Sequence, residues 1–129
     1  PYRIKFWIMS KYKAKTVFHS FKYAFHGIFV ALKSQRNVRI DFFASLAALF
    51  LGFYLHISPI EFCIILLVIS LVITAEFLNT IVEFIVDAYF GNEYSILAKM
   101  SKDIAAGMVL ISAIISLVIG GIIFLPKVL

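Results

Sequence analysis

Residues 75–87 read AEFLNTIVEFIVD and place three carboxylates, Glu76, Glu83 and Asp87, in the second half of a long apolar run. Each ionisable group in a bilayer interior costs several kcal/mol, so acids retained there usually serve a function. On a helix turning about 100° per residue, these acids share an arc of about 100° with Asn79 and Thr80, spread over roughly 16 Å along the axis. The segment therefore predicts a transmembrane helix whose polar face runs from inside the membrane toward one surface.

The composition places the whole chain among integral membrane proteins. Its 129 residues are 63% apolar and 16% aromatic, and the mean hydropathy is +1.02, which excludes an ordinary soluble domain. This length gives room for a single membrane domain over 1–129. Three apolar stretches predict transmembrane helices over 38–57, 60–87 and 104–125, the last ended by Pro126. We therefore expect an all-α membrane fold with three spans.

Short motifs mark the ends of these predicted helices. Ser58 suits an N-cap, Pro59 the first helical position, and Glu61 closes a capping box. After the second helix, Gly91-Asn92 breaks the apolar pattern and opens a polar connection that we expect to run over 88–103. Asp41, like Glu61, falls at a membrane edge, and we interpret both acids as boundary or cap residues.

The N-terminal arm, residues 1–37, is basic and amphipathic. Nine lysines and arginines and no acid lie in the first 40 residues. Lys15, Lys22 and Lys33 share one face of a helix and phenylalanines occupy the neighbouring face, which is typical of a helix lying in the membrane interface. A cytosolic helix packed on a partner is the alternative. Attraction to anionic lipid accounts for the positive charge better than nucleic-acid binding does, and the stretch lacks the form of a signal peptide.

The loop charges predict the orientation. Two spans separate the arm from the 88–103 connection, so both lie on one side, together with Lys99 and Lys102, while the other side has only Lys127. The positive-inside rule assigns the arm and this connection to the cytoplasm. The acid face of the second helix then approaches the cytoplasmic surface, where ATP is available.

Paired acids in a helical membrane protein are compatible with a cation pathway, a structural polar network or a metal-assisted active site. A transporter usually has its acids near the midplane on broken helices, whereas these lie off-centre on an unbroken helix near Lys102-Asp103. A lysine binds phosphate as a point charge, and Mg²⁺ bridges phosphate and carboxylate. Phosphoryl transfer needs little more than these groups and a base. The residues alone favour an enzyme only modestly over a transporter.

The chain resembles the prokaryotic diacylglycerol kinase family in two linked motifs. They are Glu76-x-x-Asn79-Thr80-x-x-Glu83-x-x-x-Asp87 and Lys102-Asp103-x-Ala105-Ala106-Gly107. Arg36-Asn37 is similar to the Gram-positive branch, whose members are mostly undecaprenol kinases. The resemblance implies a homotrimer of three-span protomers, each with an interfacial amphipathic helix, that transfers the γ-phosphoryl group of Mg·ATP to a lipid alcohol in a bacterial plasma membrane.

The resemblance also implies roles for single residues. Glu76 matches the general base that deprotonates the lipid hydroxyl, with Ala106 beside the lipid. Glu83 matches a carboxylate that holds Mg²⁺ with the ATP phosphates. The expected nucleotide contacts are Asn79, Asp87, Lys102, Asp103, Tyr23, Glu93, Tyr94 and Ser95.

One position departs from the family pattern. Gln35 stands where the family has a glutamate that serves as a second metal ligand. An amide oxygen can bind Mg²⁺ but brings no charge, so we expect a weaker metal site and slower turnover without loss of the fold. Undecaprenol is the preferred acceptor and diacylglycerol the alternative; a catalytically weakened homologue and a small cation-conducting protein are the remaining hypotheses.

Overall fold

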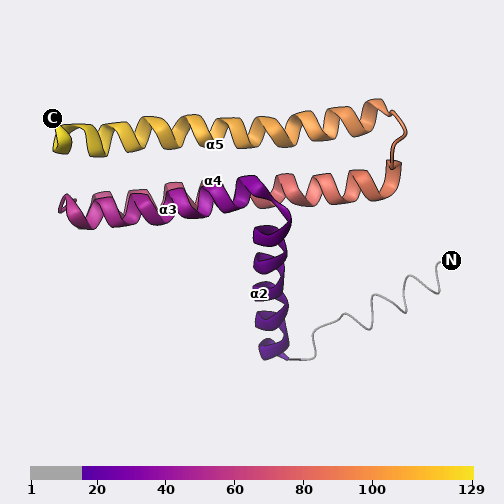
Figure 1. The fold of residues 1–129 in the computed structure, drawn as a ribbon, viewed down its shortest axis with the longest axis horizontal. Coiled ribbons are helices and arrows are strands. Elements are labelled where there is room, and N and C mark those ends of the chain that lie inside the picture. Colours follow the sequence, from indigo (N-terminus) through magenta and orange to yellow (C-terminus); the bar gives the residue numbers. More distant parts are fainter. Residues whose placement is uncertain (1–15) are drawn as a thin grey trace. The chain divides into compact units, whose positions relative to one another are not determined.

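The computed structural model describes residues 16–129, and every regular element in that range is an α-helix. The helices are α2 (Val17–Ser34), α3 (Arg36–Tyr54), α4 (Pro59–Phe90) and α5 (Ile96–Val128), as drawn in Figure 1. They belong to two compact units, α2 to the first and α3 to α5 to the second. The part of the predicted arm before residue 16, including Lys15, lies outside the described residues.

Three helices form the membrane part. By length and composition, α3, α4 and α5 are each long and apolar enough to cross a membrane. Successive helices run in opposite directions, and α4 packs against both α3 and α5 (Figure 1). The predicted all-α fold with three spans is therefore confirmed.

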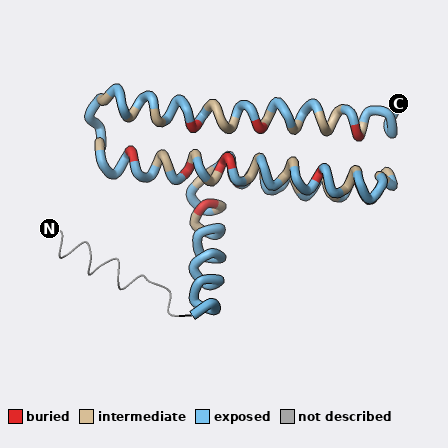
Figure 2. Tube along the Cα trace, turned by 180° about the vertical axis from the view of Figure 1, so that it is seen from behind, coloured by how far each residue is buried: buried red, intermediate tan, exposed pale blue. Residues whose placement is uncertain are grey.

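Few side chains are buried inside this three-helix unit. Figure 2 shows isolated buried positions along helices whose other positions are exposed or of intermediate burial. Small or polar residues supply most of the buried positions of α4 and α5 near their contact, namely Ala75, Glu76, Thr80, Ala105 and Ser112. Small side chains let helix backbones approach closely in lipid, where large apolar side chains need no cover from water. The outer faces are thus suited to lipid or to further subunits.

The turn between α3 and α4 has the predicted cap. The Ser58 hydroxyl accepts a hydrogen bond from the Glu61 backbone N–H at 3.1 Å, and the Glu61 carboxylate accepts one from the Ser58 N–H at 3.0 Å. Pro59 stands at the start of α4, where its missing N–H costs nothing. At the other end of α4, Gly91 has a φ of 61°, a conformation that glycine adopts without strain. Both ends of helix α4 therefore lie within a few residues of the ends of the predicted span.

The third membrane helix is longer than the sequence pattern predicts. It begins at Ile96 rather than 104, so Lys102 and Asp103 lie on a helix and not in a connection. Apolar periodicity identifies only the part of a helix that lies in hydrocarbon, whereas Lys99 and Asp103 extend the helix with an ion pair one turn apart, at 2.6 Å. Pro126 does not end the helix, because it lies in the last turn and removes only one hydrogen bond there.

The helix α2 carries a row of exposed aromatic side chains. Phe18, Phe21, Phe25 and Phe29 are between 58% and 76% exposed. Lys33 lies 5.9 Å from the centre of the Phe29 ring. Aromatic and basic side chains on one short helix agree with the predicted interfacial helix, whose position at the membrane stays a prediction.

Candidate functional site

The polar face of α4 is graded from buried to exposed. Glu76 is 5% exposed, Asn79 and Glu83 are partly buried, and Asp87 is exposed. The Thr80 hydroxyl donates to the Glu76 backbone carbonyl at 2.8 Å, so it does not occupy the Glu76 carboxylate. The Asn79 amide donates to the Glu83 carboxylate at 3.3 Å. The acids therefore lead from the protein interior to its surface along one helix.

The position of Glu76 along α4 fits a reaction at a membrane surface. Counted from Pro59 at 1.5 Å per residue, Glu76 lies about 26 Å along the helix and Glu83 about 36 Å. The hydrocarbon core of a bilayer is about 30 Å thick. With Pro59 at one boundary, Glu76 falls just inside the opposite boundary and Glu83 just outside it.

A further acid joins this face from α3. The side-chain carboxyl group of Asp41 lies beside that of Glu76. The interpretation of Asp41 as a boundary residue is therefore incomplete, although that of Glu61 as a cap residue is confirmed. The sequence contained one indication of this proximity. The short turn after α3 makes α3 and α4 antiparallel neighbours, so Asp41, near the start of α3, is expected at the level of the acids near the end of α4.

Lysines of α5 stand at the exposed end of the acid face. The Lys102 ammonium contacts the Asp87 carboxylate at 2.8 Å, with side chains 44% and 62% exposed. Asp103 pairs with Lys99 on its own helix and not with α4. Exposed ion pairs add little to stability and exchange partners readily. Lys102 is thus a cation beside the acids, and an incoming phosphate can compete with Asp87 for its ammonium group.

Gln35 lies at the N-cap of α3, with no side-chain capping bond. The helices α3 and α4 are antiparallel, and Asp41 lies beside Glu76. Gln35 comes about 9 Å before Asp41 on α3, and Glu83 comes about 10 Å beyond Glu76 on α4. Gln35 and Glu83 therefore lie at about the same height along the helix pair. Among residues 16–129, no group of three His, Cys, Asp or Glu side chains could hold a metal ion alone. Mg²⁺ in nucleotide sites takes one or two protein ligands and completes its shell with phosphates and water. Glu83 and Gln35 offer oxygens of the kind that Mg²⁺ takes, and their role as metal ligands stays a prediction.

The remaining predicted site residues are more scattered. Glu93 and Tyr94 are exposed in the turn after α4, and Ser95 is the N-cap of α5. Ala106 is exposed, whereas its neighbour Ala105 is 1% exposed and makes the helix contact. Tyr23 lies on α2, in the other unit, and its role stays a prediction.

An apolar groove has Asp41 among its lining residues. Its volume is about 200 Å³, and side chains of α3, α4 and α5 line it. Asp41 provides the charge, among lining residues such as Ala44, Ala48, Val72 and Phe124. The groove is therefore lined by apolar side chains and by one carboxyl group, that of Asp41, which lies beside Glu76.

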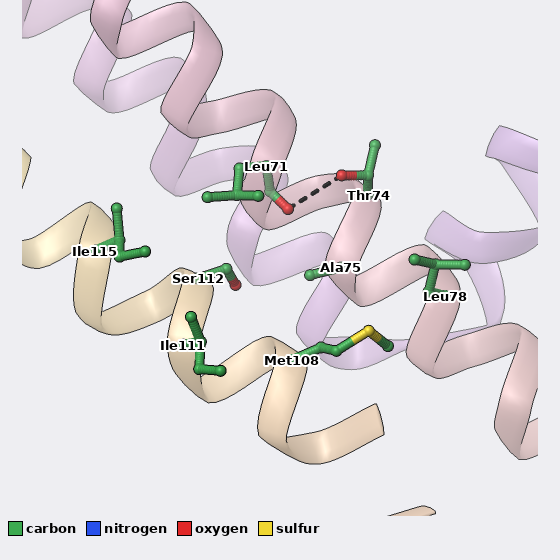
Figure 3. Close-up of a pocket in the computed structure, with 8 residues that line it drawn as sticks. All are labelled: Leu71, Thr74, Ala75, Leu78, Met108, Ile111, Ser112 and Ile115. Carbon is green, nitrogen blue, oxygen red and sulfur yellow. Dashed lines mark hydrogen bonds between the residues drawn. The ribbon is translucent and has the colours of Figure 1, made fainter. Parts of the chain in front are cut away.

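A second hollow, of about 270 Å³, lies between α4 and α5 and is almost wholly apolar (Figure 3). Its polar side chains satisfy their own helices, since Thr74 donates to the Leu71 carbonyl at 3.1 Å and Ser112 to the Val109 carbonyl at 2.8 Å. No ionisable group lines this hollow. The hollow can therefore hold an apolar group, but its lining supplies no acid, base or charged side chain.

Similarity to known proteins identifies the chemistry that goes with this arrangement. Residues 22–124 match the family model for prokaryotic diacylglycerol kinase. The chain belongs to the prokaryotic diacylglycerol kinase family. Membership of this lipid kinase family, together with three apolar helices, makes the chain a multi-pass membrane protein and confirms the resemblance found in the acid motif.

Three similar proteins show how far the similarity extends. An undecaprenol kinase of Bacillus subtilis is 42% identical over 110 residues, 85% of this chain and 89% of that protein. A diacylglycerol kinase of Synechocystis sp. is 41% identical over 110 residues, but the chain spans only 63% of that protein. A diacylglycerol kinase of Haemophilus influenzae is 33% identical over 107 residues, 82% of this chain and 90% of that protein.

Proposed function

We propose that this chain transfers the γ-phosphoryl group of ATP to the hydroxyl group of a membrane lipid alcohol at the cytoplasmic face of a bacterial plasma membrane. One observation carries the proposal. A buried carboxyl group, Glu76, is connected through Asp41 to an apolar groove and along α4 to exposed acids and a lysine. The hydroxyl group of a lipid that stays in the bilayer and the phosphates of a nucleotide that stays in water can therefore both reach the region of the Glu76 carboxyl group.

In this scheme the lipid enters from the bilayer. Its hydrocarbon chain occupies the groove beside Ala44 and Val72, and its hydroxyl group reaches Glu76. The Glu76 carboxylate takes the hydroxyl proton while the lipid oxygen bonds to the γ-phosphorus and ADP leaves. Burial of Glu76 keeps water from competing for the phosphoryl group.

The nucleotide binds at the exposed end of the acid face. The Lys102 ammonium group leaves Asp87 and binds phosphate oxygens, because a triphosphate carries more negative charge than one exposed carboxylate. Glu83 and Gln35 would hold Mg²⁺, which would neutralise charge on the phosphates. The turn residues Glu93 and Tyr94, with Ser95, Asn79, Asp103 and Tyr23, complete the proposed nucleotide contacts.

Undecaprenol is the acceptor that we propose first. The Bacillus subtilis undecaprenol kinase is 42% identical and is covered to 89% of its length, whereas the Synechocystis diacylglycerol kinase is 41% identical but covered to 63%, and that of Haemophilus influenzae is covered to 90% but 33% identical. Diacylglycerol is the second candidate, supported by the names of two relatives. Both are lipid alcohols, and the groove accepts an apolar chain of either kind.

The working form is proposed to be a homotrimer with its N-terminus in the cytoplasm. The large apolar side chains on the outer faces of α3, α4 and α5 leave room for neighbouring subunits. Glu83 and Lys102 are partly open to solvent in a single chain, so a neighbouring subunit would help to close the nucleotide site.

One assay separates the competing functions. Purified protein in mixed micelles receives Mg²⁺ and ATP labelled in the γ-phosphate, with either undecaprenol or diacylglycerol. Labelled undecaprenyl phosphate is the expected product. Faster labelling of diacylglycerol would reverse the acceptor assignment, and binding of nucleotide and lipid without product would indicate a silent homologue. Cation flux across liposomes without ATP consumption would contradict the kinase proposal altogether.

A further inference from the structure

The surface of α2 is divided lengthwise into an aromatic face and a basic face. At 100° per residue, the aromatic face spans an arc of about 80° and consists of Phe18, Phe21, Phe25 and Phe29. The basic face is the neighbouring arc, about 60° wide, and consists of the exposed residues His19, Lys22, His26 and Lys33. The helix contains no acidic residue. The basic face is therefore a row of charged or protonatable nitrogens without a carboxylate on its own helix.

The angle between the two faces fits lipid headgroups as the partner. A helix in the membrane interface buries its apolar face at the boundary of the acyl chains, and its flanks lie at the level of the headgroups. The centre of the basic face is about 90° from the centre of the aromatic face. Its side chains thus follow one flank at headgroup depth instead of pointing away from the bilayer. Phosphate oxygens of anionic lipids lie at that depth and accept charge-assisted hydrogen bonds from cations.

Half of the basic face can change its charge near neutral pH. Histidine gains its proton between about pH 8 and pH 5, whereas lysine stays charged throughout this range. Two lysines give the face a charge of about +2 above the range, and two protonated histidines raise it to about +4 below it. Each cation close to an anionic membrane surface strengthens the attraction roughly fivefold. The attraction therefore increases as the pH falls and weakens as the pH rises.

The local structure of α2 permits this change of charge. The Thr16 hydroxyl oxygen accepts a hydrogen bond from the His19 backbone N–H at 3.3 Å and lies 2.9 Å from His19 Nδ1. A hydroxyl can donate to a neutral ring nitrogen or accept from a protonated one, so the helix cap survives in both states. Within the described part of this unit, the charged groups on the same face as the histidines are Lys22 and Lys33.

We propose that the basic face of α2 binds the phosphate groups of anionic lipids, and that His19 and His26 strengthen this binding as the pH falls. The partner is the surface of an anionic bilayer. The inference does not depend on the proposed kinase activity, since it concerns how firmly α2 is held at the membrane.

The test measures the depth of α2 in bilayers that contain the full chain. Cys63 is the only cysteine, so Cys63→Ser gives a background in which Ile28→Cys, at the edge of the aromatic face, carries a single nitroxide label. Collision with oxygen and with a neutral nickel chelate reports whether the label is immersed. In bilayers with about one-third phosphatidylglycerol, the ratio of immersed to exposed label should rise at least about tenfold from about pH 7.5 to about pH 5.5. In pure phosphatidylcholine it should not change with pH.

Two double variants identify the groups responsible. His19→Gln with His26→Gln should keep the ratio of pH 7.5 at both pH values, because an amide does not titrate. His19→Lys with His26→Lys should keep the ratio of pH 5.5 at both, and it decides the question should the glutamine variant fail to fold. The matched control is His56→Gln, in the turn between α3 and α4, which should retain the wild-type pH response.

Three results would overturn the inference. They are a label depth that is the same at both pH values in anionic bilayers, a pH response that persists in either double variant, and an equal response in phosphatidylcholine. The last result would show that protonation acts within the protein instead of through lipid phosphates. Since label depth is read without ATP, none of these outcomes bears on whether the chain is a kinase.

Discussion

The two ends of the α4–α5 pair contain similar residues in different settings. At the turn end, Glu61 accepts a hydrogen bond from the Ser58 backbone N–H and pairs with Lys127 at 3.4 Å. At the site end, Asp87 pairs with Lys102 at 2.8 Å, but the more deeply buried Glu76 faces another acid. Each end thus has one acid–lysine bridge between the same two helices. Only the site end also has a buried acid whose contacting ionisable partner is another acid.

The difference separates acids that serve the fold from acids kept for chemistry. The contacts of Glu61 satisfy a helix terminus and an ammonium group, which is a structural role complete in itself. A buried carboxyl group beside another acid does not stabilise the fold to a comparable extent. The predictions below ask whether activity and stability divide between the two ends in this way.

A large effect is expected from Glu83→Gln, at the site end. Loss of the carboxylate that holds Mg²⁺ and phosphates should lower kcat/KM for Mg·ATP about 100-fold or more, with the thermal midpoint unchanged. The measurement is phosphoryl transfer over a range of Mg²⁺ concentrations. A variant that keeps wild-type Mg²⁺ dependence would remove Glu83 from the metal role.

The bridge at the site end should be replaceable without loss of the fold. Lys102→Met is expected to raise the KM for ATP about tenfold, because it removes a charge-assisted contact to phosphate. Lys99→Met is the matched control, since Lys99 pairs with Asp103 on the same helix. Equal KM values for the two variants would contradict a specific role for Lys102.

A gain of several-fold is expected from Gln35→Glu. A second carboxylate at the level of Glu83 should tighten Mg²⁺ binding and raise turnover at limiting Mg²⁺. Gln35→Met, similar in length and without a ligand oxygen, is the control and should be slower than the wild type. Equal rates for the wild-type chain and Gln35→Glu would refute the idea that the amide weakens the metal site.

The smallest effect on activity is expected at the turn end. Ser58→Ala removes the N-cap of α4 and should lower stability by about 1 kcal/mol. Thermal denaturation in micelles measures this loss, and phosphoryl transfer well below the midpoint should equal that of the wild type. A loss of activity larger than the loss of folded protein would mean that the two ends are not independent.

The sequence predicts the fold better than it predicts the site. Apolar length and the Ser58–Glu61 motif place three spans and the start of α4, because membrane thickness and helix capping act locally. Periodicity does not reveal that α5 continues outside the membrane to Ile96, since that part is polar. The approach of Asp41 to Glu76 depends on how two helices pack, and the short turn between α3 and α4 was the one feature of the sequence that indicated it.

The most direct test of the account measures stability and turnover together for Glu76→Gln, in the micelles used for the wild type. Glutamine keeps the shape of the side chain and can donate to Asp41, so the thermal midpoint should stay the same or rise. Transfer of labelled phosphate to lipid should fall by about a thousandfold or more, because the base is gone. Product formed at a rate near that of the wild type, or a loss of activity that merely follows a loss of folded protein, would contradict the account.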